Sequence, residues 1–210
     1  MRILVTGFEP FGNNRVNPSI EAVKLIPERI KHADILKLEL PVVFNEGADL
    51  LIRQVHEILP DAVICTGLAA DRKMITPEVR AVNLREARLP DNHGYQPKRE
   101  KISPDGPDEL FSTLPVMEMT NILTAYGIPA ALSFSAGTYV CNEVMYALLA
   151  CQRESFPDMT AGFVHVPYAT EFSEDRPGVF SMPVMNIRAA LELCIREVVK
   201  KQALSKSGMI

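Results

Sequence analysis

Short apolar runs alternate along the chain with stretches whose apolar residues recur every three to four positions. The apolar runs predict strands at residues 3–6, 34–40, 62–66, 130–135 and 163–166. The first, third and fifth of these are short and mostly apolar, which is typical of strands covered on both faces. The alternation of strands with helices therefore predicts a three-layer α/β/α sandwich around a mainly parallel, twisted sheet.

Three stretches have helical spacing, and each carries one apolar face. These faces are formed by Ala48, Leu51, Ile52, Val55, Ile58 and Leu59, by Val140, Val144, Ala147, Leu148 and Cys151, and by Ile187, Leu191, Cys194 and Val198. Pro60 ends the first helix, and Pro18 after Asn17 predicts another helix start. The polar segment 89–110 holds four prolines and interrupts the alternation, as a functional or irregular excursion does. We predict one domain over residues 1–204 and a frayed tail over 205–210.

Composition narrows the class of protein. Apolar residues make up 47% of the 210 residues and charged residues 23%, the proportions of a globular domain. The net charge is −4 and no long basic run appears, so we expect no nucleic-acid partner. No apolar stretch approaches 18 residues, and the first residues do not resemble a signal peptide. The sequence therefore favours a cytoplasmic protein without a membrane partner.

Ligand sites in parallel sheets lie at the carboxyl ends of the strands. In this chain that rule selects residues 7–12, 67–72, 137–142 and 165–168. The first segment, GFEPFG, has neither of the glycine spacings that cradle a phosphate.

Of the four cysteines, Cys141 has a context that suggests chemistry. It follows the turn Ser-Ala-Gly (135–137) and begins a helix, where the positive end of the helix dipole favours a thiolate and can hold an oxyanion. Cys65, Cys151 and Cys194 lie within apolar patterns and are predicted to be in the core. The cysteines form no CxxC pair and have no histidine at ligand spacing, so neither a metal site nor a disulfide is expected.

A cysteine nucleophile needs a base, and His165 is the histidine whose position fits. It ends an apolar strand at the same edge of the sheet as Cys141, whereas His32, His56 and His93 fall on surface or turn positions. A buried histidine that only satisfies the core is the alternative interpretation, and residues alone leave both open.

Six motifs together resemble the pyroglutamyl peptidases of the cytosolic cysteine type, also called pyrrolidone-carboxylate peptidases. They are LVTGFEPFG (4–12) with NPS (17–19), LPVVF (40–44), GLAADR (67–72) with the following AVN and ARLPDN, FSTLP (111–115), SAGTYVCN (135–142) and HVPY (165–168). The resemblance covers nearly the whole chain, and its specificity comes from the order and spacing of the motifs.

The resemblance implies roles for individual residues. The family's nucleophile matches Cys141, its base His165 and its acidic partner Glu78. The arginine that helps to stabilise the oxyanion matches Arg88. The aromatic residues placed against the pyrrolidone ring match Phe8 and Phe11, and the asparagine near them matches Asn17.

The implied activity is removal of an N-terminal pyroglutamyl residue from peptides, with no metal and no cofactor. Bacterial members of the family further suggest a homo-tetramer. Two alternatives remain at this stage: another thiol amidohydrolase on the same frame, and a non-catalytic protein that binds a small ligand.

The chain departs from the family pattern at three positions. Asp71 replaces a glycine in GLAADR, Val79 follows Glu78 where an arginine is usual, so that Arg80 is displaced by one step, and Phe134 replaces an asparagine before the Ser-Ala-Gly turn. We expect these changes to alter substrate affinity or stability and to leave activity intact.

Overall fold

Six strands form the central sheet of the computed structural model, which describes residues 1–174 and 178–206. Their order across the sheet is β2 (Arg29–Ile30), β3 (Ala33–Leu40), β1 (Arg2–Phe8), β4 (Ala62–Leu68), β8 (Thr160–Val166) and β5 (Thr76–Pro77). The four inner strands are parallel, and the two edge strands are antiparallel to their neighbours. The parallel arrangement brings the carboxyl ends of β1, β4 and β8 to one edge.

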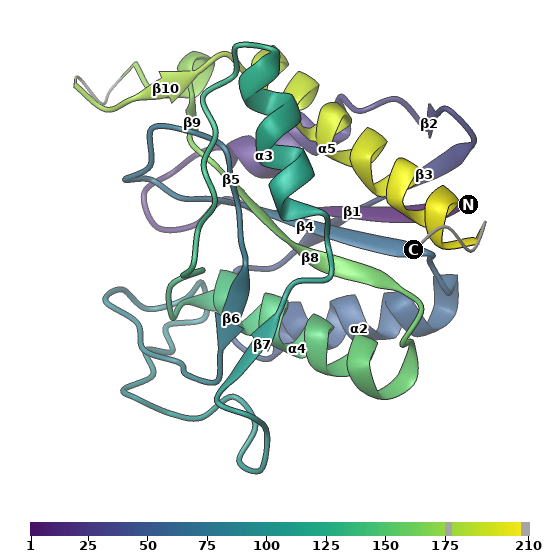
Figure 1. Ribbon diagram of the computed structural model, residues 1–210. Coiled ribbons are helices and arrows are strands. Elements are labelled where there is room, and N and C mark those ends of the chain that lie inside the picture. Colours follow the sequence, from purple (N-terminus) through teal and green to yellow (C-terminus); the bar gives the residue numbers. More distant parts are fainter. Residues whose placement is uncertain (175–177, 207–210) are drawn as a thin grey trace.

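Helices cover both faces of this sheet (Figure 1). One face carries α1 (Pro18–Lys24), α3 (Val116–Ala125) and α5 (Val184–Lys206), and the other carries α2 (Glu46–Ile58) and α4 (Val140–Ser155). The inner strands are buried on both sides: Val5 faces the core under α1 and α5, and its neighbour Leu4 faces the core over α2 and α4. The predicted three-layer α/β/α sandwich is confirmed.

Smaller elements lie beyond the carboxyl edge of the sheet and beside it. They are an antiparallel pair, β6 (Arg80–Val82) with β7 (Glu109–Phe111), a parallel pair, β9 (Tyr168–Ala169) with β10 (Ser181–Met182), and the 3₁₀ turn η1 (Thr170–Phe172). The proline-rich excursion begins after β6 and returns in β7, so the interruption predicted from its polar sequence is observed.

The helical spacings predicted α2, α4 and α5, and Asn17 caps α1 as its position before Pro18 suggested. The helix α3 was not predicted, although its Met119 and Leu123 are fully buried against α5. The core prediction is confirmed for Cys65 and Cys194, whereas Cys151 is half-buried.

Residues 130–135 are not a strand, and that prediction is wrong. The segment makes only isolated bridges, and it lies along β5, where Pro77 has no N–H group to donate to a regular ladder. Its backbone is nevertheless held: Ser133 N–H donates to Pro77 O (3.0 Å), and Val79 N–H donates to Ser133 O (2.7 Å). The segment therefore runs beside Glu78, which follows β5.

At the end of the chain, α5 continues to Lys206, two residues into the segment predicted as a tail, and residues 207–210 lie outside the described part. Among the described helices, none combines the length and apolar character that crossing a membrane requires.

Candidate active site

His165 and Glu78 form a buried pair at the carboxyl end of β8. Nδ1 of His165 lies 2.7 Å from Oε1 of Glu78, and the two residues are 4% and 0% exposed. Glu78 reaches this position because its N–H donates to Phe163 O (2.9 Å), which ties the residue after β5 to the neighbouring strand. A carboxylate only accepts hydrogen bonds, so Nδ1 carries the proton and Nε2 is the basic nitrogen.

The Cys141 thiol lies beside this pair because Gly67 leaves room for it. Gly67 on β4 is in register with His165 on β8, and paired residues of neighbouring strands point their side chains to the same face. A Cβ on Gly67 would lie 2.9 Å from Sγ of Cys141 and 2.8 Å from the Phe163 ring, too close for any side chain. The glycine thus permits the first turn of α4 to place Sγ over the strand next to the imidazole.

Sγ and the imidazole are neighbours without a hydrogen bond between them, as far as the described residues show. Catalytic contacts in ligand-free sites are often long and tighten when the substrate binds.

Desolvation favours the neutral form of both Cys141 and His165. It raises the pKa of the Cys141 thiol to about 12, and the charge of Glu78 adds to that effect. Burial also lowers the pKa of His165, against the opposing influence of Glu78. For Glu78 itself, burial would raise the pKa, but the interaction with His165, a hydrogen bond from Ser133 and the charge of Arg72 together outweigh it and lower the pKa below its usual range. Desolvation of the sulfur therefore opposes the thiolate that the helix start favours.

We expect the alkylation of Cys141 by iodoacetamide to accelerate continuously with pH through pH 9, because a thiol of raised pKa supplies more thiolate at each step. Mass spectrometry of the Cys141 peptide against pH measures this rate. A plateau below about 8.5, the value of an ordinary cysteine, would contradict a neutral resting pair.

The start of α4 offers polarised N–H groups next to Sγ. Tyr139, at the N-cap, makes no side-chain cap, and its carbonyl accepts the N–H groups of Asn142 (3.0 Å) and Glu143 (3.2 Å). The N–H of Cys141 is directed at its own sulfur and lowers the pKa of the thiol. A negative oxygen that forms on a carbonyl attacked by Sγ would therefore meet this N–H and the positive end of the helix.

Arg88 lies on an exposed segment beside the turn that leads into α4. Glu86 N–H donates to Thr138 O (2.9 Å), and the Tyr139 hydroxyl donates to Pro90 O (3.1 Å), which holds the two segments together. The Arg88 side chain itself is exposed. The structure thus brings Arg88 to the rim of the site and does not bring its guanidinium into the hydrogen bonds of Glu78 and His165.

Phe8 and Phe11 lie on the α4 side of the sheet edge, and they differ in burial. Phe8 is 2% exposed, and its ring centre is 6.3 Å from that of Phe163. Phe11 is half-buried, with its ring centre 6.2 Å from that of Tyr139. Phe8 is therefore part of the core, whereas Phe11 keeps a surface that a ligand could touch.

Asn17 uses its amide to hold the end of β1 and the loop after it, which carry Phe8 and Phe11 respectively. Oδ1 accepts from Ser19 N–H (3.1 Å) and from the Ser19 hydroxyl (2.9 Å), while Nδ2 donates to Glu9 O (3.0 Å). The Ser19 hydroxyl oxygen in turn accepts from Phe8 N–H (3.1 Å). The observed contacts give Asn17 a structural task, the anchoring of the Phe8–Phe11 loop to α1.

Arg72 is the residue at this site to which the sequence gave no role. Its Nη1 donates to Oε1 of Glu78 and to Oγ1 of Thr76, and its Nη2 donates to Ser135 O (2.7 Å). The only signal in the sequence is its place in the motif GLAADR, because its partners come from other segments.

The departures from the family pattern gather on one surface. Arg80 Nε donates to Phe134 O (2.9 Å), and Arg80 also pairs with Glu109. Asp71, Arg80 and Phe134 line a shared open cavity of about 750 Å³, onto which Arg72 also opens. Their predicted influence on affinity or stability would therefore act from outside the buried Glu78–His165 pair.

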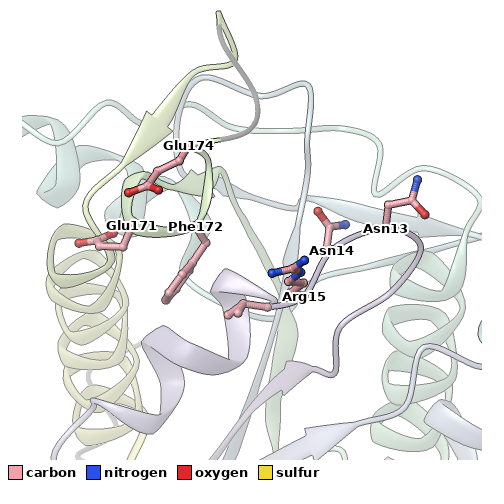
Figure 2. A pocket seen from close by; sticks show the side chains of 7 residues that line it. Asn13, Asn14, Arg15, Glu171, Phe172 and Glu174 are labelled. Carbon is pink, nitrogen blue, oxygen red and sulfur yellow. The ribbon is translucent and has the colours of Figure 1, made fainter.

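A second cavity, of about 440 Å³, opens between the loop after Phe11 and the segment around η1 (Figure 2). Its lining is mostly polar and consists of Asn13, Asn14, Arg15, Val16, Glu171, Phe172 and Glu174. It lies on the α1 and α5 side, because Glu171 accepts from Val184 N–H (2.9 Å) at the start of α5. The aromatic rings of Phe8 and Phe11 pack on the other side of the sheet edge, so this cavity is not the apolar pocket predicted for a ring.

No group of three or more metal-ligating side chains is present among the described residues.

Comparisons with known proteins agree on one family. The model of the family described as pyroglutamyl peptidase matches residues 1–201. The pyrrolidone-carboxylate peptidase of Streptococcus suis is 42% identical over 211 aligned residues, which cover 99% of this chain and 98% of that protein. That of Clostridium perfringens is 43% identical over 199 residues, covering 95% and 93%.

Solved structures give the same result for the fold. Pyroglutamyl peptidase I of Bacillus amyloliquefaciens superposes with a TM-score of 0.88 at 40% identity, covering 92% of this chain and 94% of that one. A mutant pyrrolidone carboxyl peptidase of Pyrococcus furiosus gives a TM-score of 0.92 at 38% identity, covering 96% and 99%. From its motifs, its fold and these relatives, the chain belongs to the pyroglutamyl peptidase family.

Proposed function

We propose that this chain hydrolyses the amide bond after an N-terminal pyroglutamyl residue, with Cys141 as nucleophile, His165 as base and acid, and Glu78 as the partner of the imidazole. One observation carries these roles. The His165–Glu78 hydrogen bond of 2.7 Å leaves Nε2 as the base, and Sγ of Cys141 lies over Gly67, the residue paired with His165 in the neighbouring strand. The family supplies the reaction class of a cysteine peptidase.

In the first half of the reaction, Nε2 of His165 takes the proton of the Cys141 thiol while Sγ attacks the pyroglutamyl carbonyl carbon. Because thiol and imidazole are neutral at rest, this transfer accompanies the attack. The Cys141 N–H stabilises the negative oxygen, with Arg88 approaching from the rim when the substrate is bound. Collapse breaks the C–N bond, and His165 returns its proton to the leaving amine, so that a thioester remains.

In the second half, Nε2 takes a proton from water as the water oxygen attacks the thioester. The tetrahedral intermediate then expels Sγ, which regains the proton from His165, and pyroglutamate leaves. Glu78 remains a carboxylate throughout, and it stabilises the imidazolium that forms twice in each cycle.

The pyroglutamyl ring is a lactam with no ammonium group, so its pocket needs apolar walls and a few main-chain groups. Phe11 and Tyr139 provide such a wall next to the start of α4. Phe8 supports it from the core, and Asn17 holds the loop.

We expect Phe11→Ala to raise KM for a pyroglutamyl arylamide with little loss of stability, because the side chain is half-buried. Phe8→Ala should instead lower the free energy of unfolding by about 3–5 kcal/mol, since it empties a core position. Steady-state kinetics and thermal unfolding of both variants separate the two effects. An unchanged KM in Phe11→Ala would remove Phe11 from the pocket.

The experiment that tests the function follows the release of aminomethylcoumarin from its pyroglutamyl, prolyl, glutamyl and glutaminyl derivatives, before and after iodoacetamide treatment. Hydrolysis of only the pyroglutamyl derivative, abolished by alkylation, supports the proposal. Comparable hydrolysis of another derivative would indicate a different thiol amidohydrolase. Hydrolysis of none of the four derivatives, together with binding of the pyroglutamyl derivative, would indicate a binding protein.

The tetramer and the cytoplasmic location that the resemblance implies stay predictions. Large apolar side chains that are more than half exposed are available for subunit contacts, and they include Leu89, Phe111, Met117, Tyr126 and Phe134. Light scattering coupled to size-exclusion chromatography measures the subunit number, and cell fractionation measures the location.

A further inference from the structure

Arg72 joins three segments that come together only in the folded chain. It lies in the loop after β4, bonds Glu78 and Thr76 through Nη1, and bonds the backbone at Ser135 through Nη2. Ser135 lies six residues before Cys141, in the turn that leads to α4. One side chain thus spans the loop, the acidic partner of the base and the approach to the nucleophile.

The Arg72 guanidinium and the His165 imidazole converge on the same oxygen. Both Nη1 of Arg72 and Nδ1 of His165 bond Oε1 of Glu78. The Arg72 side chain is 25% exposed and that of Glu78 is fully buried, so the ion pair is only weakly screened by water. A planar guanidinium can direct two N–H groups at two fixed acceptors, whereas a lysine ammonium is a single point of charge.

We propose that Arg72 is a positioning residue of the reaction, whose guanidinium fixes the Glu78 carboxylate against His165 and ties it to the Ser135 turn that places Cys141. This inference rests on the proposed function for its activity readout. It assigns Arg72 no contact with the substrate.

The charge of Arg72 also has a defined sign of effect on each reacting group. It lowers the pKa of Glu78, of His165 and of Cys141. Besides Arg72, Cys141 faces the titratable groups of Glu78 and Cys65. His165 and Glu78 face each other. Without Arg72, the pKa of His165 should rise, so the base is lost at a higher pH on acidification.

A matched pair of arginines makes the test specific. Arg72→Gln should lower kcat about 10²-fold through misplacement of the acidic partner and the turn. It should also move the acid limb of the kcat/KM profile up by about 1 pH unit. Arg80→Gln removes an arginine from the same cavity that bonds Glu109 and Phe134 instead, and it should leave the acid limb unmoved.

Arg72→Lys separates charge from geometry. The substitution keeps the positive charge and loses the planar guanidinium that bonds two acceptors at once. The acid limb of the kcat/KM profile should therefore stay near that of the unmodified protein, while kcat remains reduced. Because Arg72 opens onto the cavity of about 750 Å³, added ethylguanidinium should restore part of the kcat of Arg72→Ala and none of that of Arg80→Ala.

Either of two results would overturn the proposal: an Arg72→Gln protein with unchanged kcat and an unchanged acid limb, or an Arg72→Lys protein with full kcat. The Arg72→Lys result remains decisive if Arg72→Gln does not fold. If the unmodified protein releases no aminomethylcoumarin, the proposed function fails on its own. The iodoacetamide profile of Cys141 then decides the role of Arg72, because Arg72→Gln should shift it to higher pH and an unmoved profile contradicts the proposal.

Discussion

Cys141→Ala is expected to remove hydrolysis of a pyroglutamyl arylamide almost completely, with kcat lowered by at least about 10⁴-fold. The thiol lies over Gly67, whose partner in the neighbouring strand is the base His165, so its loss leaves the substrate carbonyl without the proposed nucleophile. Cys141→Ser should be nearly as inactive, because a hydroxyl is far less acidic than a thiol and the shorter C–O bond places its oxygen away from the position that sulfur takes. Steady-state kinetics with the pyroglutamyl arylamide measure this loss of kcat, and circular dichroism verifies that the variants are folded.

Cys151 supplies the matched control on the same helix. It is half-buried, with Sγ 4.0 Å from Nε2 of the exposed His56, and Cys151→Ser should retain full activity. For the fully buried Cys65 and Cys194, replacement by serine should cost about 1–3 kcal/mol of stability. A folded Cys141→Ala protein that still turns over substrate would end the proposal of a cysteine nucleophile.

His165→Ala should lower kcat nearly as far as Cys141→Ala, because no other described base bonds Glu78 at this point of the sheet edge. Glu78→Gln should lose less, about 10²–10³-fold, since a glutamine oxygen can still accept from Nδ1 and the oxyanion contacts remain. A larger loss in His165→Ala than in Glu78→Gln would show that His165 transfers protons and that Glu78 orients the imidazole. Equal losses would contradict that division of roles.

The pH dependence of Glu78→Gln has a definite sign. The carboxylate raises the pKa of both His165 and Cys141, so its removal should shift the acid limb and the alkylation profile to lower pH. Arg72→Gln should shift both in the opposite direction, because the charge of Arg72 lowers the same two pKa values. A Glu78→Gln protein with full kcat and an unmoved profile would show that Glu78 has no part in the reaction.

The amphipathic spacing of α2, α4 and α5 and the apolar runs of β1, β4 and β8 were readable in the sequence, because burial on one or two faces imposes a local period. The same reasoning led to Cys141 and His165, since the end of a parallel strand and the start of a helix must meet at one sheet edge. It failed at residues 130–135, whose apolar run is compatible with a strand. Only the neighbouring Pro77 shows why a regular ladder is missing.

What the tertiary structure alone decided is the electrostatic state of the site. A helix start by itself favours a thiolate at Cys141, but the fold places this half-buried residue beside Glu78, and desolvation of its sulfur raises the pKa to about 12. Arg72 bonds Thr76, Glu78 and Ser135, which lie 4, 6 and 63 residues away, and no periodicity of the sequence reveals that these contacts meet on one side chain. Local sequence periodicity determines which residues face the core and which end a strand, whereas charge and desolvation depend on neighbours brought together only by folding.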